Sequence, residues 1–281
     1  MEHLARLYAQ HKDWPGLKQW VFVEAADAIY ADSNPHMTTA AGLSVDGTTE
    51  FLQELQKTDD RVRYIPFGFT SHSNPAQGKC AARTSYLAAA DKVKPQFIVV
   101  LDADEYYCKQ TQRQLMTAMA TAESKWKGFC FKHRHPWHPP SISHLPLFSH
   151  EVVGGFWDIP LCRGWRWQIG LRYRANHNTP ETSGGLLLDE QLLRLYGQKG
   201  CPECIHMAFT SAVHCRRAKH QYYVARGEGR TDHRQWYVDS RAAYETWRPG
   251  ATLPNNARVI KYNGPIPECF ATEIANDPED D

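Results

Sequence analysis

The fold is decided by one stretch of the chain, which reads Gln96-Phe-Ile-Val-Val-Leu-Asp-Ala-Asp-Glu-Tyr-Tyr107. Its apolar residues 97–101 run without alternation, a pattern typical of a strand that is buried on both faces. Three carboxylates follow at once, and in open α/β sheets the ligand site lies beyond the carboxyl ends of the strands. On an extended chain Asp102 and Asp104 project to the same side, where they suit Mg²⁺ or Mn²⁺. The alternative is a solvated acidic turn.

The chain before this stretch alternates between predicted helices and strands. Helices are expected at residues 2–12, 50–55 and 78–90, and strands at 20–23 and 61–65. Thr48 or Thr49 is the expected N-cap of the second helix, and Pro66 is expected to end the second strand. This order predicts an α/β protein with a Rossmann-type, mostly parallel central sheet flanked by helices.

The composition indicates a soluble globular enzyme or binding protein. The chain has 281 residues, of which 42% are hydrophobic and 22% charged, so a large core is expected and wholesale disorder is not. The net charge of +1 gives no general attraction to nucleic acid or membranes. No apolar run approaches the ~20 residues needed to span a bilayer, and the N-terminus lacks a leader-like apolar segment. Eight scattered cysteines suit reduced thiols, so a cytoplasmic location is expected.

Several short motifs occur together in an order that resembles a known family. They are Glu24, the turn Ser44-Val-Asp-Gly-Thr48, Gly78-Lys79 with Arg83 on the next helix, and Leu101-Asp-Ala-Asp-Glu105. In this order they resemble the nucleotide-sugar half of a family 2 type glycosyltransferase with the GT-A fold. The resemblance covers residues 18–107 and reaches more loosely to a His near 206. The chain departs from the family pattern at residues 25–43, which are short and polar where an extra strand and helix are usual.

The resemblance implies a role for each matching residue. Glu24 and Asp46 would lie near the nucleotide, with Asp46 at its base or ribose, while Asp102 would reach ribose or a metal-bound water. Asp104 would bind Mn²⁺ or Mg²⁺ directly, and His206, late in the chain, would complete the metal site. The donor expected for such a site is a UDP-linked sugar.

Two basic residues of the third predicted helix are candidates for diphosphate binding. Lys79 and Arg83 lie one turn apart, so they face the same way and can meet two phosphates. The alternative is a solvated basic face of the helix.

The second half of the chain has a different composition. Residues 125–178 hold eight Lys or Arg against two acids, interleaved with aromatic residues that can stack on sugars or bases. We expect residues 1–125 to form the nucleotide-sugar half of one domain, 126–265 a strand- and loop-rich acceptor half, and 266–281 a flexible acidic tail. The alternative for the aromatic residues is a place in the core.

An inverting sugar transfer needs a general base for the acceptor hydroxyl. Asp189 has a spacing after the Asp-x-Asp pair that is similar to the base of inverting relatives. Glu181, Glu190 and His177 are competitors, and a retaining enzyme would need no such base.

The motif Cys201-Pro-Glu-Cys204 has two interpretations. With His206, His214 or Cys215, the two thiolates can form half of a zinc site. Alternatively, His206 belongs to the metal site of the Asp-x-Asp pair.

We therefore predict a metal-dependent glycosyltransferase that moves a sugar from a nucleotide-sugar donor to a hydroxyl acceptor. The acceptor can be a glycan or a small molecule. It can also be DNA with hydroxymethylated bases, which phage-type glycosyltransferases modify. A non-catalytic protein that binds nucleotides or nucleic acid is the alternative from a different class.

Overall fold

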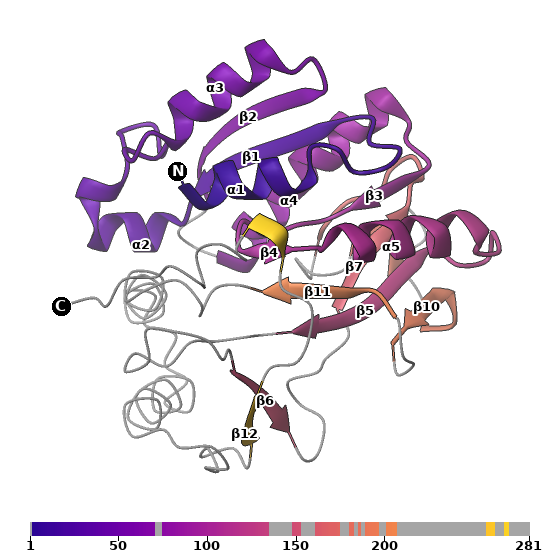
Figure 1. Ribbon diagram of the computed structural model, residues 1–281. Helices are drawn as coiled ribbons and strands as arrows, with labels where there is room; N and C mark the ends of the chain where they lie inside the picture. The colour runs from indigo at the N-terminus through magenta and orange to yellow at the C-terminus, as the bar shows by residue number, and fades with distance from the viewer. Residues whose placement is uncertain are drawn as a thin grey trace.

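The protein is a mixed α/β structure of helices and several groups of strands (Figure 1). The computed structural model describes residues 2–70, 75–134, 148–152, 161–174, 180–182, 185–186, 189–196, 201–206, 257–261 and 267–269. Within them the helices are α1 (Glu2–His11), α2 (Ala28–Ser33), η1 (Pro35–Met37), α3 (Thr48–Thr58), α4 (Pro75–Val93), α5 (Lys109–Thr121) and η2 (Asp189–Gln191).

The strands form one larger sheet and three two-stranded pairs. They are β1 (Trp20–Ala26), β2 (Val62–Phe69), β3 (Phe97–Val99), β4 (Glu105–Tyr106), β5 (Gly128–Arg134), β6 (Phe148–Val152), β7 (Leu161–Arg166), β8 (Glu181–Thr182), β9 (Gly185–Leu186), β10 (Leu192–Leu195), β11 (Glu203–His206) and β12 (Ala257–Lys261). Each helix and strand expected between residues 2 and 101 is present, with ends that shift by a few residues.

Strands β1 and β2 pair in parallel, as the strand–helix–strand order predicts. The expectation that Pro66 ends the second strand is wrong, because β2 continues to Phe69. Pro66 lies opposite Glu24, and the register shifts directly after this pair. A missing backbone N–H is tolerated at such an irregularity, so the strand continues past the proline.

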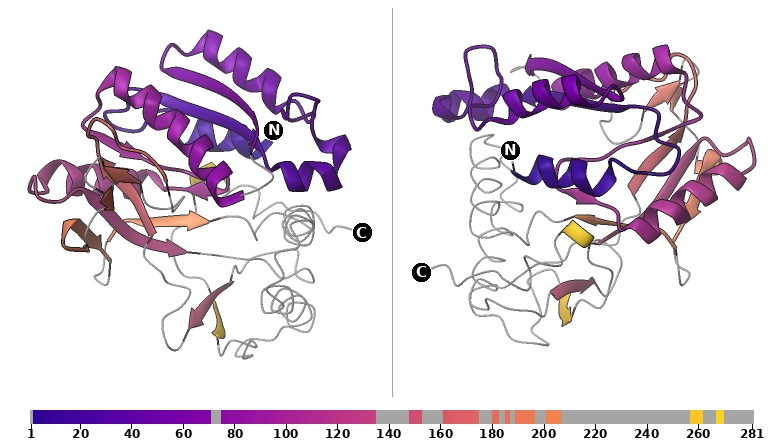
Figure 2. Two further views of the ribbon diagram at one scale, coloured as in Figure 1. Left: turned by 180° about the vertical axis from the view of Figure 1, so that it is seen from behind. Right: turned by 45° about the horizontal axis from the view of Figure 1, so that its top comes forward.

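The larger sheet is mixed rather than mostly parallel. Its order is β3-β7-β5-β11-β4, and β10 also pairs with β5. Strand β7 runs antiparallel between β3 and β5, whereas β10 and β11 both run parallel to β5. Strands from before and after residue 125 therefore share one sheet, and the two predicted halves are joined through their backbones. Figure 2 shows this sheet from two further sides.

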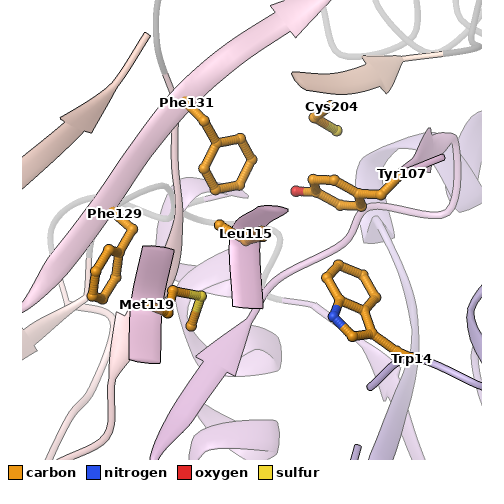
Figure 3. Packing of buried hydrophobic residues seen from close by; sticks show 7 residues of the cluster. All are labelled: Trp14, Tyr107, Leu115, Met119, Phe129, Phe131 and Cys204. Carbon is orange, nitrogen blue, oxygen red and sulfur yellow. The ribbon is translucent and has the colours of Figure 1, made fainter. Parts of the chain in front are cut away.

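The main core lies between α5 and the larger sheet. Its buried residues include Trp14, Tyr107, Leu115, Met119, Phe129, Phe131 and Cys204 (Figure 3). Trp165, one of the aromatic residues of the basic second half, is also fully buried in a neighbouring cluster. Trp165 therefore fills the core, as the alternative interpretation of the aromatic residues expected, and its ring does not stack on a ligand at the surface.

The chain after the carboxylate stretch is held by α1. The backbone N–H of Tyr107 donates to Nε2 of His11 at 2.9 Å, and His11 Nδ1 donates to the carbonyl of Leu7 at 2.7 Å. In the neutral form of this fully buried imidazole, one ring nitrogen thus donates a hydrogen bond and the other accepts one. Burial lowers the pKa of His11 to about 4.

The start of the predicted flexible tail is docked on the same region. Glu268 accepts hydrogen bonds from Gln10 Nε2 at 2.5 Å and from the backbone N–H of Lys109, at the start of α5, at 3.1 Å. A carboxylate at a helix N-terminus is favourable because it pairs with N–H groups that have no helical partner. Residues 267–269 are therefore a docked segment, and residues 270–281 lie outside the described part.

Among the described residues, no helix combines the length and the apolar character needed to cross a bilayer.

The titration of His11 predicts how stability depends on pH. The unfolded chain binds a proton at this residue near pH 6.5 and the folded chain only near pH 4, so stability should fall as the pH drops through this interval. The loss attributable to His11 is about 3 kcal/mol. Urea unfolding between pH 6.5 and pH 4 should show a smaller loss of unfolding free energy for His11→Gln than for the unmodified protein, because glutamine does not titrate. An equal pH dependence in both proteins would contradict this assignment.

Candidate functional site

The carboxylates lie at the end of β3, as the sequence predicts. Backbone pairing with β7 continues through Val100, whose N–H donates to the carbonyl of Arg163 at 2.8 Å. The chain then turns: the N–H of Glu105 donates to the carbonyl of Asp102 at 3.0 Å, and the N–H of Asp102 donates to Glu105 Oε2 at 3.1 Å. The extended geometry expected for Asp102 and Asp104 is wrong, because residues 103 and 104 form this turn.

Asp102 contacts two arginines that come from different elements. Oδ1 lies 2.5 Å from Nη2 of Arg83 on α4, and Oδ2 lies 2.9 Å from Nη2 of Arg163 on β7. The Asp102 side chain is 40% exposed, so the pair opens to solvent on one side. The structure thus brings together Asp102 and Arg83, and it places Lys79 one turn earlier on the same helix.

Arg163 was missed by the sequence reasoning, and it connects the exposed and buried carboxylates. The same Nη2 that contacts Asp102 also bonds Oε1 of Glu105, in a pair whose side chains are only 4% and 2% exposed. Burial opposes the charged guanidinium, but Glu105 and Asp102 together raise the pKa of Arg163 above its ordinary value. In the sequence, nothing separates Arg163 from the other basic residues of its segment.

Behind Glu105 lie two more side chains with metal-binding chemistry. His133 of β5 places Nδ1 3.8 Å from Glu105 Oε1, and the ligand atoms of Glu105, His133 and Cys204 all lie within 4.8 Å of one another. Burial and the neighbouring Glu105 raise the pKa of the Cys204 thiol well above its ordinary value. Figure 3 shows Cys204 beside the ring of Tyr107 in the main core.

The backbone of His206 comes next to the carboxylate turn. In the antiparallel pair of β11 and β4, His206 lies directly opposite Glu105, one residue from Asp104. The proximity was predicted from the family resemblance. Its role as a metal ligand, like that of Asp104, stays a prediction.

Glu24 holds the Asp-Gly-Thr turn in place. Its buried carboxylate accepts hydrogen bonds from the N–H of Ser44 at 2.6 Å, from the Thr49 hydroxyl at 3.0 and 3.1 Å, and from the Tyr64 hydroxyl at 2.5 Å. Burial and this carboxylate raise the pKa of Tyr64 to about 12. The structure therefore shows Glu24 positioning the turn, and its contact with a nucleotide stays a prediction.

The turn presents Asp46 at the surface. Asp46 Oδ1 accepts the N–H of Thr48 at 3.1 Å, and the side chain is exposed. The N-cap of α3 is Gly47, with a φ of 86° that favours glycine, so the expected cap by Thr48 or Thr49 is wrong. The Thr49 hydroxyl is used by Glu24 instead.

The candidate bases lie in three different situations. Asp189 begins η2, just before β10, and Leu192 of β10 lies opposite Gly128, the first residue of β5. Since β3 and β5 run in the same direction, Asp189 lies at the opposite end of the sheet from Asp102, and the structure does not bring the two together. His177 lies outside the described residues.

Glu181 is the candidate base that the structure places beside α4. It is buried in β8, and its backbone exchanges hydrogen bonds of 2.6 and 2.9 Å with Arg172. Burial raises the pKa of Cys80 on α4, where Arg83 lowers it and Glu181 raises it. Arg172, the backbone partner of Glu181, also forms an ion pair of 3.0 Å with Asp91 of α4, so Glu181 lies near the helix that carries Arg83. Glu190, the other competitor, is exposed beside Asp189.

A cavity of about 650 Å³ lies between β1 and β3, which belong to separate sheets. Its walls are mainly apolar, with Trp20, Phe22 and Val99 among them, and Arg83 and Asp102 also contribute to the lining. The ion pair of Arg83 and Asp102 therefore borders this apolar space.

Comparison with protein-family models and with curated proteins found no match to the chain.

The buried ion pair predicts a large stability effect at Arg163. Replacement with Met leaves the Glu105 carboxylate without its cation, which should cost about 3–5 kcal/mol. The double variant Arg163→Met/Glu105→Gln should lose less, because no buried charge remains there. Urea unfolding measures both.

The matched control is Lys57→Met, which removes an exposed ion pair with Glu54 and should change stability by at most about 0.5 kcal/mol. If Arg163→Met lowered the free energy of unfolding no more than this control does, the buried pair of Arg163 and Glu105 would not stabilise the fold as predicted.

Proposed function

We propose that the protein is a divalent-metal-dependent glycosyltransferase that uses a nucleotide-sugar donor, with a UDP-sugar as the expected donor. One observation carries this proposal: the carboxylate turn after β3 is in direct contact with Arg83 of α4. The carboxylates suit a hard cation, and the basic helix face suits a diphosphate. A nucleotide sugar with a bound metal ion needs both kinds of group at one place.

The carboxylates have different expected roles. Asp104 is the expected direct ligand of Mn²⁺ or Mg²⁺, and His206 opposite Glu105 is the expected second protein ligand. Asp102 is held by Arg83 and Arg163, so its orientation is fixed before any ligand binds. This arrangement supports a role for Asp102 toward ribose or a metal-bound water.

The basic residues would stabilise the leaving group. When the bond between the sugar and the diphosphate breaks, negative charge develops on the departing phosphate oxygen. The metal ion would act as a Lewis acid on this charge. Lys79 and Arg83 offer further cationic donors from one face of α4. Arg83 can turn from Asp102 toward phosphate without losing a charged partner.

The acceptor side is less constrained. If the transfer inverts the sugar, we propose Glu181 as the base in preference to Asp189, because Glu181 is buried near α4 and Asp189 lies at the opposite end of the sheet from Asp102. The acceptor hydroxyl can belong to a glycan, a small molecule or a hydroxymethylated DNA base. These acceptors can be compared directly in a transfer assay with a radiolabelled donor.

Slow donor hydrolysis tests the proposal without knowledge of the acceptor. Incubation with a panel of UDP-sugars and Mn²⁺ should release UDP, and Asp104→Asn should abolish the release because a metal ligand is lost. Chelation of the metal should have the same effect. UDP is measured with a coupled enzymatic assay.

Glu54→Gln is the matched control, since it removes an exposed carboxylate on α3 and should leave UDP release unchanged. Absence of metal-dependent nucleotide binding in calorimetry would overturn the proposal. Binding of UDP and Mn²⁺ without any turnover of donor, with or without acceptors, would favour the non-catalytic alternative.

The basic face of α4 should contribute to nucleotide affinity. Lys79→Gln and Arg83→Gln should each weaken UDP binding about tenfold or more, because a charge-assisted hydrogen bond to phosphate is lost. Lys92→Gln, in the last turn of the same helix, is the control and should bind UDP as the unmodified protein does. Calorimetric titration with UDP in the presence of Mn²⁺ measures the three affinities. Equal affinities for all variants would place the diphosphate elsewhere.

A further inference from the structure

Three buried side chains from three neighbouring strands form a compact group beneath the carboxylate turn. Glu105 lies on β4, His133 on β5 and Cys204 on β11, and β11 is paired with both of the other strands. Their ligand atoms lie within 4.8 Å of one another, and the three side chains are at most 2% exposed. We propose that Glu105, His133 and Cys204 bind one zinc ion as a structural site.

The donor atoms favour zinc over the ion expected at Asp104. A carboxylate oxygen, an imidazole nitrogen and a thiolate are the usual zinc ligands, whereas Mg²⁺ and Mn²⁺ prefer oxygen donors. The two sites also differ in access, since the Asp102 side chain is 40% exposed and the group around Glu105 is closed to solvent. Structural zinc usually has four protein ligands, and the three buried ones here would supply all but one of them.

The positions of the ligands require small movements only. Zinc binds oxygen and nitrogen at about 2.0–2.2 Å and sulfur at about 2.3 Å. In a tetrahedral site, two ligand atoms at these distances are separated by about 3.5 Å, so the ligand atoms, which lie within 4.8 Å of one another, need to close in by about 1 Å at most. Among the described side chains, no fourth Cys, His or acidic group joins the three, so an enclosed water molecule would complete the tetrahedron.

Arg163 would compete with a zinc ion for the carboxylate of Glu105. Its Nη2 bonds the same Glu105 Oε1 that faces His133, and it also bonds Asp102. Zinc at Oε1 would displace the guanidinium from Glu105 and leave it on Asp102, where it keeps a charged partner. Because zinc binds a cysteine as its thiolate, zinc binding would release the Cys204 proton to solvent.

The charges around the loaded site would balance. Asp102, Asp104, Glu105 and the Cys204 thiolate carry four negative charges, and Arg83, Arg163 and Zn²⁺ carry four positive ones. Desolvating an ion without such compensation would be prohibitive in a closed site.

The zinc set differs from the pair suggested by the Cys-x-x-Cys motif. Cys201 precedes β11, is partly exposed and does not belong to the group, whereas Cys204 is fully buried in it. The two cysteines therefore provide a matched pair of variants three residues apart. Cys204→Ser removes a proposed ligand, and Cys201→Ser is the control.

The proposal is tested by measuring the metal content of the full chain and by recording the absorption spectrum of its cobalt-substituted form. Protein purified from zinc-supplemented medium should contain about one zinc per chain by plasma mass spectrometry. Protein prepared with Co²⁺ in place of zinc should show the visible bands of tetrahedral cobalt and one thiolate-to-cobalt charge-transfer band. Cys204→Ser should lose the bound metal and this band, while Cys201→Ser should keep both.

Zinc well below one per chain in the unmodified protein would overturn the proposal, as would equal metal loss in the two cysteine variants. If Cys204→Ser does not fold, the cobalt spectrum of the unmodified protein still decides, because absence of a thiolate band excludes Cys204 as a ligand. None of these measurements involves a nucleotide sugar, so their outcome is independent of the glycosyltransferase proposal.

Discussion

The site depends on one guanidinium nitrogen, Nη2 of Arg163, which contacts both Asp102 and Glu105. Glu105 is buried, and a buried carboxylate without a cation or several donors is strongly unfavourable. Arg163 supplies that cation from β7, the strand that runs between β3 and β5. The same contact fixes Asp102 at the surface. The exposed carboxylate that suits ligand binding is thus oriented by an ion pair whose other partner lies in the core.

A second buried carboxylate is stabilised in a different way. Glu24 has three neutral donors around it, and they come from the 44–49 segment and from β2. Hydrogen bonds of this kind replace the lost hydration of the charged form. Their consequence is positional, because they fix the loop that carries Asp46 against the end of β1. The buried acids Glu24 and Glu105 therefore hold the neighbouring loops in position, while Asp46 and Asp102 remain accessible.

Much of the fold could be predicted because it depends on local patterns. The helix at 78–90 and the parallel pairing of β1 with β2 follow from periodicity and from the order of elements. The apolar run at 97–101 does form a strand, but burial on both faces is wrong, because β3 ends the order of the larger sheet, pairs with antiparallel β7 and is only partly buried. The failures are also physical. Pro66 was expected to end its strand, but a register shift beside it accommodates the missing N–H. Asp189 was chosen by spacing along the chain, and spacing does not show that β10 begins at the far end of the sheet.

The sequence by itself determined which residue types follow β3, the presence of a basic face on α4, and the succession of helices and strands that makes the fold α/β. These features rest on local periodicity and on chain chemistry. The tertiary structure decided which charges meet. It selected Arg163 from among many basic residues, gave Glu24 to the loop, and placed His133 and Cys204 behind Glu105. Those pairings depend on strand order and register, which join residues far apart in the chain and leave no local signal in it.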